Sequence, residues 1–306
     1  MKICTVAIFH CASGVGSAWN CAEGIVDSFS SLGYQTIDCG DPRYTNIDLD
    51  SICHADLIIL SAVEWYKNVI IERYGQSWFE FQIPKVAWYA ESVHRDDQDF
   101  PFDQCKPLAD LHYFPAIQDA EEFNGHWLPF GVDTEVFKPY VVESKIPVAF
   151  LGTMYPKRQE FCQNINYPIA HIGSVFGSTP LESALSLAKA YCIPNIFVNL
   201  PSYSRLLVTK VTEVMACGTM LITPAVDHYS GIQNMKQFEN GKHLVYYDPN
   251  NPKELGEIIN YYSNNLDERD RIAKLGFDEV TSKHTIRHRA TQIIEDVISL
   301  THTISL

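Results

Sequence analysis

The sequence has little positive charge, no long apolar run and no closely spaced pair of cysteines. Its 306 residues include 23 Lys and Arg against 37 Asp and Glu, so the formal net charge is -14. Such a charge repels phosphate backbones, and the composition therefore argues against nonspecific binding to nucleic acid. A local basic patch is still compatible with it.

Long apolar runs are missing as well. No stretch reaches the roughly 18 residues that a membrane-spanning helix needs, and the first residues show no signal-peptide cleavage pattern. Hydrophobic residues make up 46% and charged residues 20%, which is ordinary globular usage and excludes disordered and fibrous classes. We expect a folded cytoplasmic protein with no transmembrane segment.

The nine cysteines include no Cys-x-x-Cys pair. A structural zinc site needs ligands paired at short spacing, and this pattern supplies none. We therefore expect no metal site and interpret the cysteines as reduced thiols within the core.

Strand-like and helix-like segments alternate through the first part of the chain. An apolar run at residues 3–9 is followed by a small-residue loop at 12–17 and an amphipathic stretch at 18–32, a pattern typical of a strand, a glycine loop and a helix. Such alternation favours a parallel sheet covered by helices. Further strands are expected at residues 34–38, 56–62 and 85–89.

The same alternation resumes near residue 145, after a connection rich in proline and glycine. We predict an α/β fold of two doubly wound, Rossmann-like domains, residues 1–140 and 141–283, with residues 284–306 as a C-terminal helix that can pack back on the N-terminal domain. The expected strands are 148–151, 170–173, 196–199 and 220–223, and the expected helices are 158–163, 183–191, 206–216, 252–264, 266–277 and 285–300.

Parallel sheets bind ligands at the carboxyl ends of their strands, so three loops are candidates for holding a nucleotide diphosphate. Gly14 and Gly16 follow the first strand and allow close backbone approach to a phosphate at a helix N-terminus, although two glycines also make ordinary tight turns. Gly152 and Thr153 lead to Lys157 and Arg158, which suit phosphate oxygens; the alternative is a solvated basic turn.

The third loop runs from Ser204 and Arg205 into a helix that carries Lys210 and Glu213. It combines a helix start, two cations and one carboxylate. A buried carboxylate needs partners, and vicinal ribose hydroxyls are suitable ones.

Residues 213–223, EVMACGTMLIT, resemble the Glu-Ala-Met-Ala-x-Gly signature of retaining, family-4-like GT-B glycosyltransferases, and are similar most of all to the spore-maturation, CgeB-like group. The similarity covers the chain from about residue 110 to the end and is poor before it. It extends to the closing helices and to these motifs: Trp127-Leu128-Pro129, Gly131-Val132-Asp133, Phe137-Lys138-Pro139, Phe150-Leu151-Gly152 with Arg158, Asn240-Gly241, Tyr247-Asp248 and residues 285–289.

This resemblance implies a GT-B fold whose two domains face a central cleft, the first on the acceptor side and the second binding the nucleotide sugar. It implies a hexosyltransferase-like enzyme that transfers sugar from a nucleoside diphosphate sugar, with a UDP-sugar favoured, to an acceptor hydroxyl, with retention. Glu213 would bind the ribose, and Lys210 and Arg158 the diphosphate leaving group. Neither cofactor nor metal is implied, and the sequence offers no convincing Asp-x-Asp pair.

One position departs from the family. Many relatives carry a first Glu eight positions before the second, where this chain has Arg205. Contact of Arg205 with a carboxylated or phosphorylated sugar, contact with the diphosphate and pairing with surface acids all stay open.

Two residues after the strand at 85–89 are acceptor-side candidates. Glu91 or His94 would contact the transferred sugar or the acceptor hydroxyl, and a histidine moves protons near neutral pH. A structural or solvated side chain is the alternative for each, and His10 is a weaker candidate. An aromatic-rich stretch suggests either an acceptor platform or, by preference, core packing: Trp65, Tyr66, Tyr74, Trp78, Phe79 and Phe81.

The rival hypotheses are a sugar-nucleotide epimerase of the same fold and a noncatalytic nucleotide-sugar-binding protein. Acceptor identity stays open between glycan, peptide, small molecule and modified nucleobase, and the sequence sets no oligomeric state.

Overall fold

The computed structural model describes residues 2–11, 16–92, 100–175, 177–203, 206–225 and 237–304. The chain divides into two compact units. Unit 1 is formed by Met1–Gly14, Ala18–Gly131 and Ile286–Leu306, and unit 2 by Val132–Thr285 with the short segment Val15–Ser17. Gly14, His94 and Arg205, which the sequence marks as candidates, lie outside the described residues.

Unit 1 contains a six-stranded sheet with the order β2-β1-β3-β4-β5-β6, in which every pairing is parallel. The strands are short runs of β-branched and aromatic residues, as expected for a sheet buried on both faces. They are β1 (Thr5–Phe9), β2 (Gln35–Gly40), β3 (Leu57–Ser61), β4 (Lys85–Trp88), β5 (Leu111–Phe114) and β6 (His126–Trp127).

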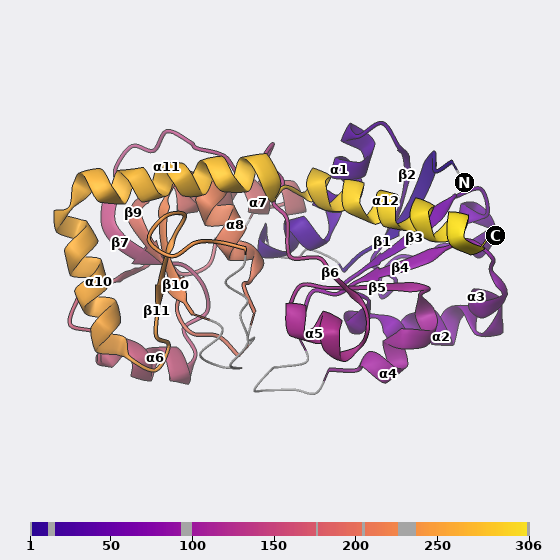
Figure 1. Cartoon of the computed structure of the whole chain (residues 1–306), viewed down its shortest axis with the longest axis horizontal. Helices are drawn as coiled ribbons and strands as arrows, with labels where there is room; N and C mark the ends of the chain where they lie inside the picture. Colours follow the sequence, from indigo (N-terminus) through magenta and orange to yellow (C-terminus); the bar gives the residue numbers. More distant parts are fainter. Residues whose placement is uncertain are drawn as a thin grey trace. The chain divides into compact units, whose positions relative to one another are not determined.

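Helices cover both faces of this sheet (Figure 1). Successive residues of a strand point to opposite faces, so they pack in two different hydrophobic clusters, one on each side of the sheet. Val6 and Ile8 pack under α1 (Glu23–Ser31) and α12 (Ile286–Ile304), so the last helix of the chain supplies part of the core of unit 1. Ala7 and Phe9 pack on the other side. That side is covered by α2 (Lys67–Tyr74), α3 (Gln76–Glu80), α4 (Phe102–Cys105) and α5 (Ile117–Glu122).

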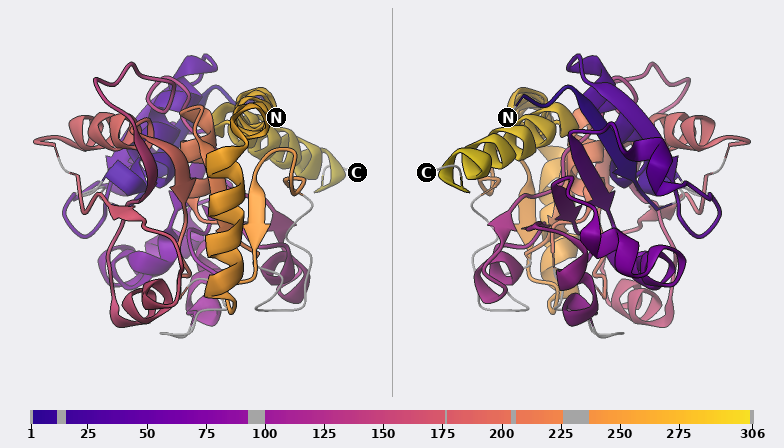
Figure 2. Two further views of the ribbon diagram at one scale, coloured as in Figure 1. Left: turned by 90° about the vertical axis from the view of Figure 1, so that its left-hand side faces the viewer. Right: turned by 90° about the vertical axis from the view of Figure 1, so that its right-hand side faces the viewer.

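Unit 2 contains a second, five-stranded parallel sheet with the order β11-β10-β9-β7-β8. Helix α10 runs beside β11 (Figure 2). The strands are β7 (Ile146–Phe150), β8 (Ala170–His171), β9 (Pro194–Val198), β10 (Met220–Pro224) and β11 (Val245–Tyr247), and the helices are α6 (Pro156–Gln163), α7 (Pro180–Tyr191), α8 (Thr209–Ala216), α10 (Pro252–Asn264) and α11 (Leu266–Lys283).

Each sheet has one point where the strand order reverses direction. In unit 1, β1 lies between β2 and β3, and in unit 2, β7 lies between β8 and β9. The loops that follow the two strands on either side of such a point diverge, which leaves a crevice at the carboxyl edge of the sheet. The loops after β1 and β3, and those after β7 and β9, are therefore the places to look for ligand-binding residues.

The predicted fold class is confirmed, since both units are parallel α/β sheets covered by helices. The single helix expected over residues 18–32 is wrong: a 3-10 helix, η1 (Gly16–Cys21), precedes α1, and Ala22 between them has φ -130° and ψ -121°. The indole of Trp19 packs against Gly24, where a Cβ would lie 2.7 Å from Nε1. This contact requires the chain to turn between the two helices.

Other sequence-based expectations meet mixed outcomes. Gly218 follows the C-cap of α8 and has φ +73°, the left-handed conformation that glycine commonly adopts after a helix. All nine cysteines are free thiols, but Cys4 and Cys53 are exposed rather than buried in the core. Within the described ranges, no helix is long and apolar enough to cross a membrane, and no group of three or more His, Cys, Asp or Glu is arranged to hold a metal ion.

Candidate functional site

The loop after β7 carries a glycine over which two cations converge. Gly152 has φ +142°, a conformation that favours glycine. A Cβ at this position would lie 3.1 Å from Nζ of Lys210 and 3.6 Å from a terminal nitrogen of Arg158. Because glycine has no Cβ, the space in front of both cations stays open. The predicted residues Gly152, Arg158 and Lys210 thus lie together at the reversal point of unit 2.

Arg158, in α6, joins the two loops that flank this point. Its buried guanidinium donates from Nε to the carbonyl oxygen of Pro201 over 2.9 Å and from a terminal nitrogen to that of Thr153 over 2.9 Å. Thr153 follows β7, and Pro201 follows β9. The guanidinium also lies 4.4 Å from the ring centroid of Tyr155. Burial lowers the pKa of Arg158, but an arginine stays charged at any physiological pH.

Lys210, in the first turn of α8, points at the same loop. Its Nζ donates to the carbonyl oxygen of Leu151 over 2.7 Å and lies 5.2 Å from the ring of Phe150. Burial, and secondarily the charge of Arg158, lower the pKa of Lys210 to about 7, while Glu213 opposes the shift. Among the described residues, neither Lys210 nor Arg158 has a carboxylate within ion-pair distance. An anion is a suitable partner for such a pair of cations.

Glu213 lies one turn further along α8 and points inward. Its side chain is fully buried, and its Oε2 accepts a hydrogen bond from the hydroxyl of Tyr191 over 3.0 Å. Burial and the neighbouring Glu213 carboxylate raise the pKa of Tyr191 well above its ordinary value, so the phenol stays a donor. The binding of ribose by Glu213 stays a prediction.

The reversal point of unit 1 carries a second set of polar residues. His10 follows β1, is buried, and pairs through Nε2 with Oδ1 of Asp38 over 3.0 Å. Burial lowers the pKa of His10, but the hydrogen bonds to Asp38 and to the carbonyl oxygen of Cys11 outweigh it and raise the pKa overall. His10 is thus held between β1 and β2. Gly16 begins η1, and Glu91 is half-buried just after β4.

Glu64 is a site candidate that the sequence analysis missed. It lies in the 3-10 helix η3 (Val63–Trp65) after β3, and its Oε1 accepts hydrogen bonds from the main-chain nitrogens of Ala90 and Glu91 over 2.7 and 2.9 Å. Its Oε2 is buried and has no hydrogen-bond partner in the described part of the chain. Burial raises the pKa of Glu64 to about 8. A single Glu after an apolar strand matches no motif, so only the fold exposes its position.

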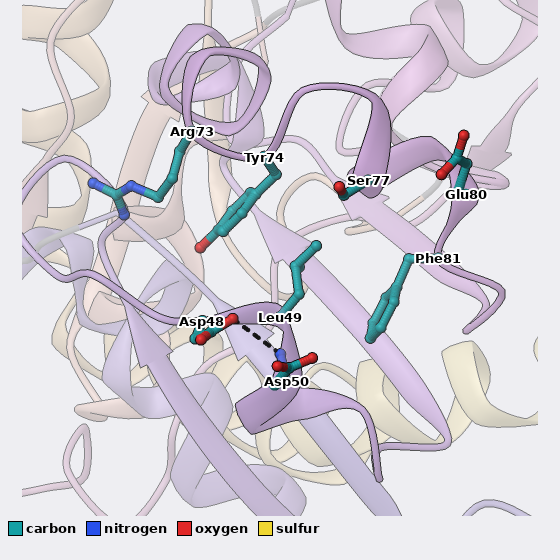
Figure 3. A pocket seen from close by; sticks show the side chains of 8 residues that line it. All are labelled: Asp48, Leu49, Asp50, Arg73, Tyr74, Ser77, Glu80 and Phe81. Atoms are coloured by element: carbon teal, nitrogen blue, oxygen red, sulfur yellow. Dashed lines mark hydrogen bonds between the residues drawn. The ribbon is translucent and has the colours of Figure 1, made fainter.

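The aromatic stretch divides between core and surface. Tyr66 and Trp78 are buried in the core of unit 1, as the preferred interpretation holds, whereas Trp65 and Phe79 are exposed. The remaining two aromatics of the stretch, Tyr74 and Phe81, line a pocket of about 420 Å³ (Figure 3). It is lined by Asp48, Leu49, Asp50, Arg73, Tyr74, Ser77, Glu80 and Phe81.

This pocket lies away from the carboxyl edge of the sheet. The 3-10 helix η2 (Leu49–Ile52) ends just before the amino end of β3, and Phe81 lies beside Lys85 at the start of β4. The Asp-x-Asp spacing of Asp48 and Asp50 serves the local fold, because Asp48 caps η2 by accepting from the main-chain nitrogen of Asp50 over 3.2 Å, as drawn in Figure 3.

Comparison with known proteins gives the family. A family model described as glycosyl transferase-like matches residues 142–295, half of the chain, and this range includes Gly152, Arg158, Lys210 and Glu213. The chain belongs to this family. It is a glycosyltransferase. The residues that lie at the reversal point of unit 2 fall within the segment that the family model matches. Comparison with curated protein sequences gives no match.

Solved structures show that this glycosyltransferase has the GT-B fold. HepE from Anabaena in complex with UDP-glucose is similar with a TM-score of 0.65 and 13% identity, over 96% of this chain and 99% of that one. Sucrose-phosphate synthase from Thermosynechococcus elongatus gives 0.63 and 13%, over 97% and 100%. An alpha-glucosyltransferase in complex with UDP and a 13-mer DNA gives 0.64 and 12%, over 96% and 99%.

Proposed function

We propose that this glycosyltransferase takes its sugar from a nucleoside diphosphate sugar, with a UDP-sugar as the favoured donor, and transfers it to an acceptor hydroxyl with retention and without a metal ion. The observation that carries the proposal is the pair of cations, Arg158 and Lys210, above Gly152 with no carboxylate partner in the described ranges. Unit 2 is then the donor side and unit 1 the acceptor side.

The leaving group explains why two fixed cations are useful. When the glycosidic bond breaks, the diphosphate gains negative charge, and donors already aimed at it lower the barrier without reorganising. Three of the five N–H groups of Arg158 hold carbonyl oxygens of Thr153, Leu200 and Pro201, which leaves two N–H groups for a ligand. The positive end of the α8 dipole adds to the same field. Lys210, held by the carbonyl oxygen of Leu151, supplies a second donor.

The donor phosphate also suits a retaining reaction. Attack from the face that the leaving group vacates lets a phosphate oxygen take the proton of the acceptor hydroxyl, so no strong enzymatic base is required. In this proposal Glu213 holds the ribose, Gly14 and Gly16 allow close approach of a ligand, and Glu91 and His94 contact the sugar or the acceptor. Arg205 is assigned to the diphosphate or to an acidic sugar.

UDP is favoured because HepE and the alpha-glucosyltransferase were solved with UDP-glucose or UDP. The latter complex also contains DNA. We do not favour DNA as the acceptor of this chain, because the net charge of -14 opposes DNA binding.

A binding experiment tests the donor site. Calorimetric titration with UDP, GDP, dTDP and CMP is made on the wild type, on Lys210→Met and on Lys189→Met, an exposed lysine of α7 that serves as control. We expect the wild type and the control to bind UDP equally, and Lys210→Met to bind at least about tenfold more weakly, because a charge-assisted phosphate contact is lost. Equal binding by Lys210→Met would overturn the assignment, and no binding of any nucleotide by the wild type would overturn the donor proposal.

Product analysis then tests transfer. Incubation with UDP-glucose and an acceptor panel should release UDP and give a glucosylated acceptor. An epimerised nucleotide sugar with no transfer would support the epimerase hypothesis instead, and binding without turnover would support the noncatalytic one.

A further inference from the structure

The reversal point of unit 1 holds a carboxyl group that the proposed mechanism does not use. Glu64 follows β3, and the loop after β1 lies on the other side of the point. The hydroxyl of Tyr66 joins the two strand ends by donating to the carbonyl oxygens of Phe9 and Ser61 over 3.2 and 3.0 Å. Glu64 therefore lies where a parallel sheet of this order places its ligands.

The backbone that presents Glu64 is in an unusual conformation. Ala62, between β3 and η3, has φ +58° and is completely buried. Its main-chain nitrogen donates to the carbonyl oxygen of Trp88 over 2.8 Å, which fixes it against β4. A left-handed alanine persists only where its surroundings enforce it, and such positions cluster at functional sites. The turn directs Glu64 toward the loop that follows β4.

The two oxygens of Glu64 have different environments. Oε1 accepts from the main-chain nitrogens of both Ala90 and Glu91, while Oε2 is buried with no partner among the described residues. A proton on the carboxyl group therefore belongs on Oε2, because both donors already point at Oε1. A buried carboxylate with one bare oxygen would be far more costly than the neutral acid.

Hydrogen bonds from the main-chain nitrogens of Glu64, Ala90 and Glu91 lower the pKa of Glu64, but the titratable side chains that face it do not favour its ionisation. Those that interact with its charge are acids: the thiols of Cys11 and Cys105, the phenols of Tyr66 and Tyr89, and the carboxyl of Glu91. Beyond Cys11 lie Asp41 and Arg43, an ion pair at 2.6 Å, and Lys67 donates its Nζ to the main-chain oxygen of Glu64 over 3.2 Å. Burial is the main cause of the raised pKa of about 8, and Glu91 adds to it.

We infer that Glu64 acts as a neutral carboxylic acid that holds the main chain of Ala90 and Glu91 at the acceptor-side edge, and that it is a positioning residue for the glycosyl transfer. This inference rests on the proposed function for its effect on turnover, but not for the protonation itself. Ionisation of Glu64 places a second negative charge beside Glu91 and loosens the loop in which the acceptor-side candidates lie.

The first experiment measures turnover of UDP-glucose between pH 6 and pH 9. The variants are Glu64→Gln, which keeps an acceptor and a neutral group, Glu64→Ala, which keeps neither, and Glu72→Gln on the exposed face of α2 as control. In the wild type, kcat should fall about tenfold between pH 7 and pH 9, because a pKa of about 8 leaves about one tenth of the acid protonated at pH 9.

Each variant has a distinct expected result. Glu64→Gln should match the wild type within about twofold at pH 7 and fall less than the wild type above it, because its amide cannot ionise. Glu64→Ala should lose about tenfold in kcat with UDP affinity unchanged, since a displaced loop affects the reacting groups and not unit 2. A tenfold loss in Glu64→Gln at pH 7, or no loss in Glu64→Ala, would overturn the inference.

A second measurement does not depend on the donor proposal. Hydrogen exchange of a peptide containing Ala90 and Glu91 is compared at pH 7 and pH 9 after correction for intrinsic exchange. Protection should drop at pH 9 in the wild type and in Glu72→Gln but not in Glu64→Gln. If protection behaves this way and UDP-glucose is not turned over, the proposed function fails alone; if protection is the same for all variants at both pH values, the role of Glu64 fails.

Discussion

Nζ of Lys210 donates to the carbonyl oxygen of Leu151 over 2.7 Å, and this contact joins the start of α8 to the end of β7. The lysine is held in place by a main-chain oxygen rather than by a carboxylate. A neutral amine can make the same hydrogen bond, which is why the contact persists although the pKa of Lys210 is lowered to about 7. The side chain is thus pre-positioned in a state that an anionic ligand can charge.

The first prediction concerns this protonation. At pH 8 most of the free protein carries neutral Lys210, and a bound diphosphate will raise its pKa, so binding of UDP should take up close to one proton. Calorimetric titration in two buffers of different ionisation enthalpy measures the uptake, and affinity should weaken as pH rises through about 7 to 9. Lys210→Met should show little uptake, and uptake equal to that of the wild type in this variant would place the proton elsewhere.

The second prediction concerns Gly152. Gly152→Ala should cost about 1–2 kcal/mol of folding stability for its positive φ and should also weaken UDP binding, because the new methyl group lies 3.1 Å from Nζ of Lys210. Gly173→Ala is the matched control, with φ +70° and nothing within 4 Å of its Cβ. Chemical unfolding should show a loss of stability in both that is larger in Gly152→Ala, whose new Cβ would also lie 3.0 Å from Cζ of Phe150, and UDP titration should show a loss of affinity in Gly152→Ala alone. Unchanged affinity there would separate Gly152 from the donor site.

A third prediction compares two tyrosine–glutamate hydrogen bonds. Tyr191→Phe leaves the fully buried Glu213 without this donor and should lower the free energy of unfolding by about 1–3 kcal/mol. Tyr261→Phe removes an exposed bond of 2.7 Å to Glu268 and should leave the stability essentially unchanged. Urea unfolding measures both. Equal losses in the free energy of unfolding would mean that the buried Glu213 does not need the hydrogen bond from Tyr191.

A fourth prediction tests the last helix. Ile293→Ala in α12 creates a cavity in the core of unit 1 and should cost about 2–5 kcal/mol, whereas Glu295→Ala on the exposed side of the helix should be near neutral. UDP affinity of the folded Ile293→Ala protein should equal that of the wild type. A stability loss of less than about 1 kcal/mol would show that α12 contributes little to this core.

The sequence predicted the strands that carry the site because β1, β3, β7 and β10 are apolar runs flanked by small or polar residues. It also predicted which residues follow β7 and that one helix carries Lys210 and Glu213, although α8 begins at Thr209 and not at Leu206. Arg158 and Lys210 meet over Gly152 because β7 and β9 are neighbours in the sheet. This adjacency is a property of the tertiary fold, so the sequence alone did not predict it.

Other features left no local signal. Glu64 is distinguished only by its burial and by hydrogen bonds from two main-chain nitrogens of the loop that follows β4. The break between η1 and α1 depends on the packing of Trp19 on Gly24, and an amphipathic pattern cannot reveal such a contact. The short strands β6 and β11 are too brief for periodicity to mark them.

The place of α12 in the core of unit 1 also has a consequence for biosynthesis. Ile286 and Ile293 pack in the same core cluster as Val6 and Ile25, although nearly all of unit 2 lies between them in the sequence. All of unit 2 has been translated before this layer exists. The nascent chain therefore exposes an unfinished apolar face of unit 1 while unit 2 already has its complete sequence, and unit 1 can be completed only after unit 2 has been translated.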